Sequence, residues 1–192
     1  MNAALRALAL LVDPSAAWTR IEKESGDAAS LLSGYVALLA LIPVLSSFIG
    51  ACLIGVIVPG AGVVRAPIFD GVFSAILGYA ATFADVLLVG LVIEALAPRF
   101  GGRRNFTSAI KLAVYSFTPV WLAGVFLLLP GLRFLLLTGF YGVYVLAKGL
   151  PLLMKSPARK SLPYTAIIVV FAAILMLLTV AAQRALFDQA GI

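Results

Sequence analysis

Five long apolar stretches constrain the fold of this chain more than any other feature of its sequence. They cover approximately residues 31–58, 71–97, 107–129, 132–154 and 162–186. As a helix rising 1.5 Å per residue, each is long enough to cross about 30 Å of hydrocarbon. Because backbone groups in lipid must be paired within their own segment, each stretch is predicted to be helical. The sequence therefore predicts an all-α integral membrane protein, a bundle of five transmembrane helices.

Composition supports a membrane protein and removes several classes of site. Hydrophobic residues make up 63% of the 192 residues and charged residues only 11%, whereas soluble domains are about half apolar and about a quarter charged. The chain has one cysteine and no histidine. A disulfide framework and His-assisted nucleophilic catalysis are therefore excluded. We expect no enzymatic activity, no cofactor and no metal site.

The basic residues predict the orientation of the bundle. The net charge is +6, but the 14 Lys and Arg residues are dispersed among apolar blocks, so we expect no nucleic-acid partner. One end of the predicted bundle holds Arg6, Arg20, Lys23, Arg99, Arg103, Arg104, Lys111, Lys148, Lys155, Arg159 and Lys160, and the other holds Arg65, Arg133 and Arg184. Since Lys and Arg accumulate in cytosolic loops, the N-terminus is predicted to be cytosolic. The C-terminus, with a short tail at 187–192, is predicted to be non-cytosolic.

Residues 1–30 precede the first predicted span. Ala7–Val12 is a short apolar run that Asp13-Pro14 interrupts at once, so we expect no cleaved secretory signal. Asp13-Pro14 is typical of a helix start, with Asp as the cap and Pro at the first position. Trp18 and Ile21 share one face of that helix. Because Trp favours the headgroup level, the segment is predicted to be an amphipathic interfacial helix, with Trp18 buried toward lipid or the bundle.

The order of several segments resembles that of a known family. They read DPSAAWTRIEKE at 13–24, RFGGRRNF at 99–106, AVYSFTP at 113–119, GFYGVYVLAKGL at 139–150 and KSPARKSLPY at 155–164. In these segments the chain resembles bacterial members of the Yip (Ypt-interacting protein) domain family. The resemblance covers nearly the whole chain. It depends on spacing and on dispersed Gly, Pro and Tyr rather than on one sharp motif.

The resemblance implies a five-span fold with a cytosolic N-terminus, in a bacterial inner membrane. Eukaryotic members of the family bind prenylated Rab GTPases and act in vesicle traffic and membrane shaping. Their long cytosolic N-terminal region is here reduced to residues 1–30, and their Asp-Leu-Tyr-Gly-Pro signature is absent. The resemblance therefore implies the fold but not Rab binding.

A polar cluster inside the membrane is the first candidate site. Asp85 lies near the middle of the second span, on a face of small residues that is typical of helix packing. Charge inside a span is costly and calls for a reason. Polar side chains at similar depths on the third and fourth spans complete the predicted cluster: Tyr115, Thr118, Tyr141, Tyr144 and Lys148. Its role is left open between hydrogen bonding that joins helices, a ligand or proton site, and lipid contact.

Two further sets of charged residues are candidate sites. Glu94 and Lys111 lie at matching depths on adjacent antiparallel spans, which predicts a structural ion pair. Six basic residues on the two cytosolic connectors predict contacts with anionic lipid headgroups or a partner. They are Arg99, Arg103, Arg104, Lys155, Arg159 and Lys160.

The sequence favours a non-enzymatic adaptor or membrane-organising protein. Its expected partners are the lipid bilayer and anionic headgroups, with a membrane-protein partner or a second copy of the chain also open. The alternative is a small transporter or channel that uses Asp85 and its polar neighbours. A water-connected cavity reaching Asp85 would favour transport, whereas a packed, dry interior would favour an adaptor.

Overall fold

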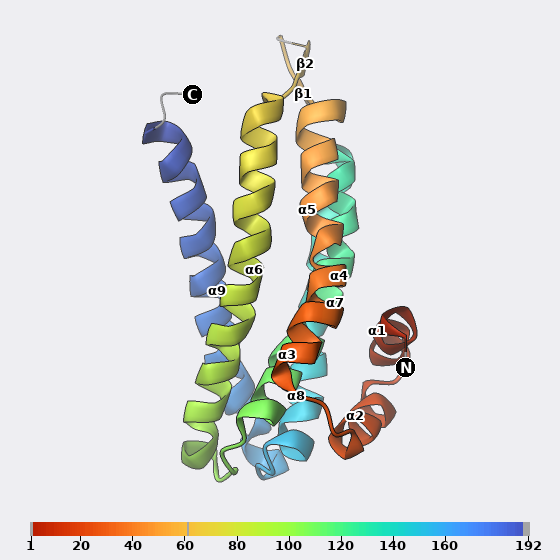
Figure 1. Cartoon of the computed structure of the whole chain (residues 1–192), viewed down its shortest axis with the longest axis vertical. Helices are drawn as coiled ribbons and strands as arrows, with labels where there is room; N and C mark the ends of the chain where they lie inside the picture. Colours follow the sequence, from red (N-terminus) through yellow and green to blue (C-terminus); the bar gives the residue numbers. More distant parts are fainter. Residues whose placement is uncertain (1, 61, 190–192) are drawn as a thin grey trace.

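The computed structural model describes residues 2–60 and 62–189 and is largely helical. Five helical segments are long and apolar enough to cross a membrane, and they run side by side along the long axis (Figure 1). They are Ala28–Ile54, Ile68–Phe100, Phe106–Leu128, Pro130–Leu153 and Ala158–Gln183. The five-span α-helical membrane fold predicted from the sequence is confirmed.

The first span is built from short pieces that follow one another. They are α3 (Ala28–Ser30), η1 (Leu31–Val36), α4 (Ala37–Leu39), α5 (Leu41–Phe48) and η2 (Ile49–Ile54), of which η1 and η2 are π-helical. The helix ends at Gly55, whose φ of 84° lies in the region that favours glycine. The predicted continuation to residue 58 is wrong. The β-branched residues that follow instead form β1 (Val56–Val58), which pairs antiparallel with β2 (Gly62–Val64).

The other four spans are more regular. They comprise α6 (Ile68–Leu96) with η3 (Ala97–Phe100), α7 (Phe106–Ala123) with η4 (Gly124–Leu128), η5 (Pro130–Phe140) with α8 (Tyr141–Leu153), and α9 (Ala158–Gln189). The fourth span begins as a 3₁₀ helix, in which the Thr138 hydroxyl donates to the Leu135 carbonyl three residues earlier at 2.7 Å. Helix α9 continues through residues 187–189 of the predicted tail. Residues 190–192 lie outside the described residues.

Helix α7 is the central element of the bundle and packs against α6, α8 and η5. Most of its residues are buried. It packs tightly on α6 at Gly90, where a Cβ would lie 2.5 Å from Ile110 Cδ1. Such contacts between small and large residues are the usual means of helix association in lipid, where no hydrophobic force acts between helices.

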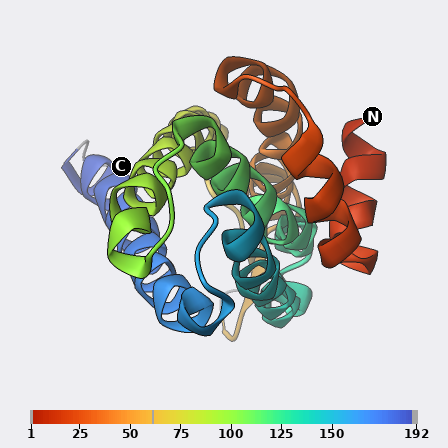
Figure 2. The same cartoon turned by 90° about the horizontal axis from the view of Figure 1, so that it is seen from below.

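Two short helices precede the first span: α1 (Ala3–Val12) and α2 (Pro14–Lys23). We call them the N-terminal hairpin. The predicted start at Pro14 is confirmed, and the Asp13 carboxylate accepts the Ala16 N–H at 3.0 Å. Helix α1 was not predicted. Figures 1 and 2 show the hairpin on the periphery, on the opposite side of the bundle from α9.

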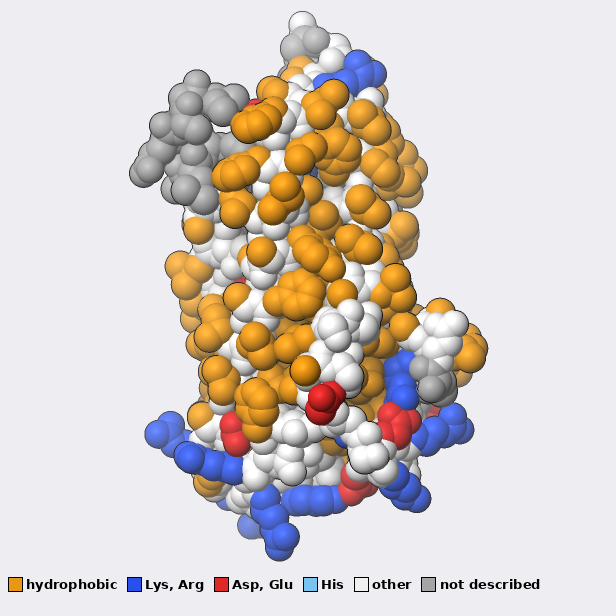
Figure 3. Space-filling model, in the orientation of Figure 1, with side chains coloured by type: hydrophobic (Ala, Val, Ile, Leu, Met, Phe, Trp, Pro, Cys, Tyr) orange, Lys and Arg blue, Asp and Glu red, His pale blue; other side chains and the backbone are white. Residues whose placement is uncertain are grey.

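Charge is concentrated at one end of the molecule. Figure 3 shows blue Lys and Arg side chains gathered at the lower end, below a flank that is mostly hydrophobic. The loops joining η3 to α7 and α8 to α9 meet at this end, where the Arg103 N–H donates to the Met154 carbonyl at 2.8 Å. We call it the basic end; the β-hairpin lies at the other end (Figure 1).

Candidate functional site

The N-terminal hairpin is attached to the bundle through Trp18. Its side chain is completely buried, and the indole N–H donates to the Val145 carbonyl of α8 at 2.9 Å. The ring lies against Gly149, where a Cβ would be 2.6 Å from Trp18 Cε2. It also meets the Tyr115 ring edge-on, with centroids 6.0 Å apart. Of the two predicted environments for Trp18, the structure selects the bundle.

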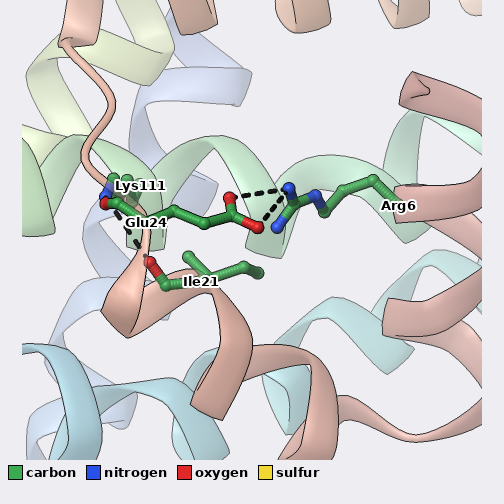
Figure 4. A network of polar contacts seen from close by, with 4 residues as sticks. All are labelled: Arg6, Ile21, Glu24 and Lys111. Carbon is green, nitrogen blue, oxygen red and sulfur yellow. Dashed lines mark hydrogen bonds and ion pairs between the residues drawn. The ribbon is translucent and has the colours of Figure 1, made fainter. Parts of the chain in front are cut away.

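A network of charges reinforces this attachment (Figure 4). The Arg6 guanidinium on α1 donates to both carboxylate oxygens of Glu24, at 2.7 and 2.6 Å. The Lys111 ammonium on α7 donates to the Glu24 carbonyl at 2.5 Å and more weakly to the Ile21 carbonyl at 3.5 Å. Arg6 and Lys111 are both buried, whereas the Glu24 side chain is 44% exposed. One residue, Glu24, therefore binds two buried cations that come from different elements.

The predicted ion pair between Glu94 and Lys111 is wrong. The ion pairs among the described residues are Arg6–Glu24 and Glu22–Lys155. Lys111 points instead toward the carbonyl groups at the end of α2, because the N-terminal hairpin covers this face of α7. Depth in the membrane can identify which residues of neighbouring helices lie at the same level. It does not determine toward which side of α7 the lysine points.

Tyr115 and Thr118 belong to the surroundings of the N-terminal hairpin. The Tyr115 ring lies between Trp18 and Tyr35, with its centroid 5.0 Å from that of Tyr35, and the Arg6 guanidinium is 5.5 Å from its centre. The hydroxyl groups of Tyr35 and Thr118 share a hydrogen bond of 2.9 Å. These aromatic and hydroxyl contacts connect the first span, α7 and the hairpin.

The tyrosines of α8 occupy a different place. The Tyr141 hydroxyl donates to the Leu11 carbonyl of α1 at 3.0 Å, and its ring centroid lies 5.5 Å from that of Tyr144. The Lys148 ammonium lies 5.5 Å from the Tyr144 ring centre, close enough for a cation–π contact. This group contacts the end of α1.

Asp85 forms a separate polar contact on the other side of the bundle. The Thr179 hydroxyl of α9 donates to its carboxyl group at 3.3 Å. Both residues line a cavity of about 730 Å³ between α6, α7, η5, α8 and α9, which we call the α6–α9 cavity. Ser116 lines it as well, and its buried hydroxyl has no hydrogen-bond partner among the described residues. The prediction of one shared cluster is therefore wrong, because none of these contacts joins Asp85 to the other five residues.

The structure brings together the six basic residues predicted for the cytosolic connectors. All lie at the basic end, and five of them are exposed, Lys160 being half-buried. Lys155 also pairs with Glu22 of α2, so the N-terminal hairpin borders this surface. We call Arg99, Arg103, Arg104, Lys155, Arg159 and Lys160 the basic rim. No group of three or more acidic or cysteine side chains that could hold a metal gathers within the described part of the chain.

Sequence reasoning missed Arg6, Glu24 and Tyr35 as site residues. Arg6 is the only charged residue of α1, and a lone charge in an apolar helix signals a specific partner. Its partner lies 18 residues away in sequence, beyond the reach of any helical periodicity. A pairing search between Arg6 and the acidic residues before the first span would have found it.

These features define a polytopic α-helical membrane protein with a helical hairpin docked at its basic end. The chain belongs to the Yip1 domain family, whose family model matches residues 8–181. It is 28% identical over 149 residues to inner membrane protein YohC of Escherichia coli strain K12, a match that covers 76% of each chain. The similarity to YohC of E. coli O6:H1 strain CFT073 has the same extent. No solved structure matches the chain.

Proposed function

We propose that this protein is a non-enzymatic membrane-organising protein of the bacterial inner membrane, and that the N-terminal hairpin is its working part. The location is supported by the similarity to inner membrane proteins and by five helices able to cross a bilayer. The basic rim supports an orientation in which the basic end, with the N-terminus, is cytosolic, as the positive-inside rule predicts. The C-terminal end of α9 then lies on the non-cytosolic side.

The outward face of α1 carries the proposal. Its one charged residue, Arg6, is turned inward to the bundle together with Leu10, and its other three leucines are turned outward. Leu5, Leu8 and Val12 are 59%, 56% and 75% exposed. At these helical spacings they form one stripe, which is unfavourable in water and favourable in hydrocarbon. The stripe therefore supports a position of α1 within the cytosolic leaflet.

A helix that lies in one leaflet adds volume to that leaflet alone. Amphipathic helices bind at the boundary of headgroups and acyl chains in this way, and their binding depends on curvature and lipid composition. The basic rim borders the hairpin and can attract anionic headgroups, each basic residue contributing about 1 kcal/mol near a charged surface. The combination supports bending or ordering of the membrane around the protein.

Reconstitution of the full chain tests the proposal. Vesicles containing phosphatidylglycerol should become smaller or tubular as the protein-to-lipid ratio rises, as measured by electron cryomicroscopy. Leu8→Gln should weaken this effect, because it places an amide in the apolar stripe. Leu162→Gln is the matched control: Leu162 is 76% exposed on α9, near the same end but away from the hairpin.

Two results would count against the proposal. Vesicles whose size is unaffected by the wild-type protein would exclude membrane organisation by the chain alone. Equal effects of the Leu8 and Leu162 substitutions would exclude a special role of α1. If vesicles are unaffected and a protein co-purifies in a fixed ratio, a role as an adaptor for that protein becomes the better interpretation.

Transport is the second candidate function. It is favoured by one observation: the α6–α9 cavity reaches Asp85, and the unbonded Ser116 hydroxyl lies on its wall. Gly90 of α6 packs on Ile110 of α7, and the two helices are antiparallel. Asp85 lies five residues before Gly90 and Ser116 lies six residues after Ile110, so the two side chains are at similar depths. Most of the cavity wall is apolar, however, which suits a hydrocarbon chain better than a hydrated ion.

A further inference from the structure

The α6–α9 cavity has the length of one membrane leaflet. Along α6 its lining extends from Gly78 to Val89, and along α9 from Ile168 to Thr179. At 1.5 Å per residue each distance is roughly 16 Å, close to half of the roughly 30 Å hydrocarbon core. The cavity is therefore an elongated space, parallel to the helices, of a size that suits an acyl chain.

The walls of the cavity are those of a hydrocarbon site. Its lower part is lined by buried aliphatic side chains such as Val86 and Leu146. Along η5 the lining includes Phe134, Leu137 and Phe140, all of them exposed at the surface of the bundle. An apolar site whose rim is open between two helices of a membrane protein is accessible to lipid from the bilayer.

Arg133 gives the cavity one positively charged end. It lines the cavity, is exposed, and forms no hydrogen bond or ion pair with any described residue. It lies three residues after Pro130, where η5 begins, and the preceding η4 packs near η2, which leads into the β-hairpin. Arg133 is therefore near the membrane boundary opposite the basic end. An arginine at that level is suited to bidentate contact with a phosphate group.

Asp85 is not needed for such a ligand. Its carboxyl group already accepts the Thr179 hydroxyl, and this contact joins the two helices that flank the cavity. A hydrogen bond of this kind between membrane helices has a structural role by itself. The charge of Arg133, which no described residue pairs, is the feature of the cavity that calls for a ligand, and the partnered Asp85 is not.

We propose that the α6–α9 cavity binds one anionic phospholipid from the leaflet on the β-hairpin side. The phosphate lies against Arg133, and an acyl chain extends down the cavity between η5 and α9. This site is separate from the N-terminal hairpin and goes beyond the membrane-organising role, since it selects a particular lipid.

Native mass spectrometry of the full chain tests this site. The protein is purified in mild detergent and incubated with phosphatidylglycerol or phosphatidylcholine bearing the same acyl chains. The protein should retain one phosphatidylglycerol per chain, and it should retain this lipid more strongly than phosphatidylcholine. Arg133→Gln should weaken its retention about fivefold, the effect expected for loss of one basic residue near the headgroups, and should abolish the preference over phosphatidylcholine.

A second variant tests whether the lipid enters the cavity. Ala173 lines the cavity on α9 and is exposed, so Ala173→Phe should fill the space and displace the lipid while leaving Arg133 intact. Ile174→Phe is the matched control, because the adjacent Ile174 is 50% exposed and does not line the cavity. Thermal unfolding of each variant in detergent checks that it folds.

Three outcomes would overturn the proposal. Equal retention of both lipids by the wild-type protein would show unselective surface lipid. Loss with Arg133→Gln but not with Ala173→Phe would place the lipid outside the cavity. If Asp85→Asn removes the bound molecule while Arg133→Gln does not, the cavity is a polar site centred on Asp85, as transport would require.

Discussion

Replacing Trp18 by alanine should detach the N-terminal hairpin while the bundle stays folded. The indole is completely buried, lies on Gly149, and donates to the Val145 carbonyl at 2.9 Å. Truncation of a buried Trp to Ala typically costs about 3–5 kcal/mol. The hairpin packs against one side of the bundle, on α7 and α8, so most of this loss should appear as local opening rather than global unfolding.

Hydrogen–deuterium exchange measures this opening directly. A loss of about 3 kcal/mol raises the population of the open state more than a hundredfold, so amides of residues 14–23 should exchange correspondingly faster. Amides of residues 106–123 in α7 should change little. Trp18→Phe is the matched control, since it keeps a ring but loses the hydrogen bond; a loss of about 1 kcal/mol should accelerate exchange only about fivefold.

Gly149 provides an independent test of the same contact. Gly149→Ala would place a Cβ 2.6 Å from both Trp18 Cε2 and Leu112 Cδ2, and overpacking of this kind costs about 1–3 kcal/mol. It should therefore also detach the hairpin. In the Trp18→Ala background the contact with the ring is removed and only that with Leu112 remains, so the same substitution should cost less, and the double-mutant cycle should show coupling.

Three results would refute this account of the docking. Unchanged exchange of residues 14–23 in Trp18→Ala would mean that the indole does not hold the hairpin. A parallel increase in the hairpin and in α7 would mean that the two unfold as one unit. Strictly additive effects of the Trp18 and Gly149 substitutions would show that the ring and the glycine do not act on each other.

Two further predictions concern charge and topology. Glu24→Gln leaves the buried Arg6 guanidinium without its carboxylate, whereas Lys111 keeps the Glu24 backbone carbonyl. The substitution should destabilise the hairpin by about 2 kcal/mol, less than the 3–5 kcal/mol of a fully buried pair because Glu24 is half-exposed. Glu22→Gln, at the more exposed pair, should cost under about 1 kcal/mol, and equal exchange rates in the two variants would contradict this ranking. In a Cys52→Ser background, an impermeant maleimide should label Val63→Cys in intact cells but label Arg104→Cys only after lysis, and the reverse pattern would invert the proposed orientation.

The five spans were predictable because their signal is local. Length and hydropathy determine a membrane helix almost independently of its neighbours, and Asp13-Pro14 likewise determined where α2 begins. The prediction was wrong for the last turn of the first span, because Gly55 ends the helix and the β-branched residues after it pair across a tight turn. Helix α1 was overlooked because its apolar run is too short to cross a membrane.

The site was predicted less well because its contacts depend on the orientation of each helix about its own axis as well as on depth in the membrane. The face of small residues predicted that Asp85 points into the bundle, and Asp85 lines the α6–α9 cavity. Its partner, Thr179, is on α9, which the predicted cluster did not include. Lys111 was assigned to Glu94 by depth, although its ammonium faces the hairpin. Helical periodicity fixes which residues share a face, whereas only the packed structure fixes which neighbour that face meets.

The two proposals concern opposite ends of the membrane and can therefore be separated by experiment. The apolar stripe of α1 lies beside the basic end, whereas Arg133 lies near the end that carries the β-hairpin. Leu8→Gln should then change vesicle shape without altering lipid retention, and Arg133→Gln should do the opposite. If each variant alters both readouts, the bound lipid and the hairpin are coupled through α7, which forms part of the cavity wall and also binds the hairpin through Lys111. Such coupling would make lipid occupancy on one side a regulator of the helix on the other.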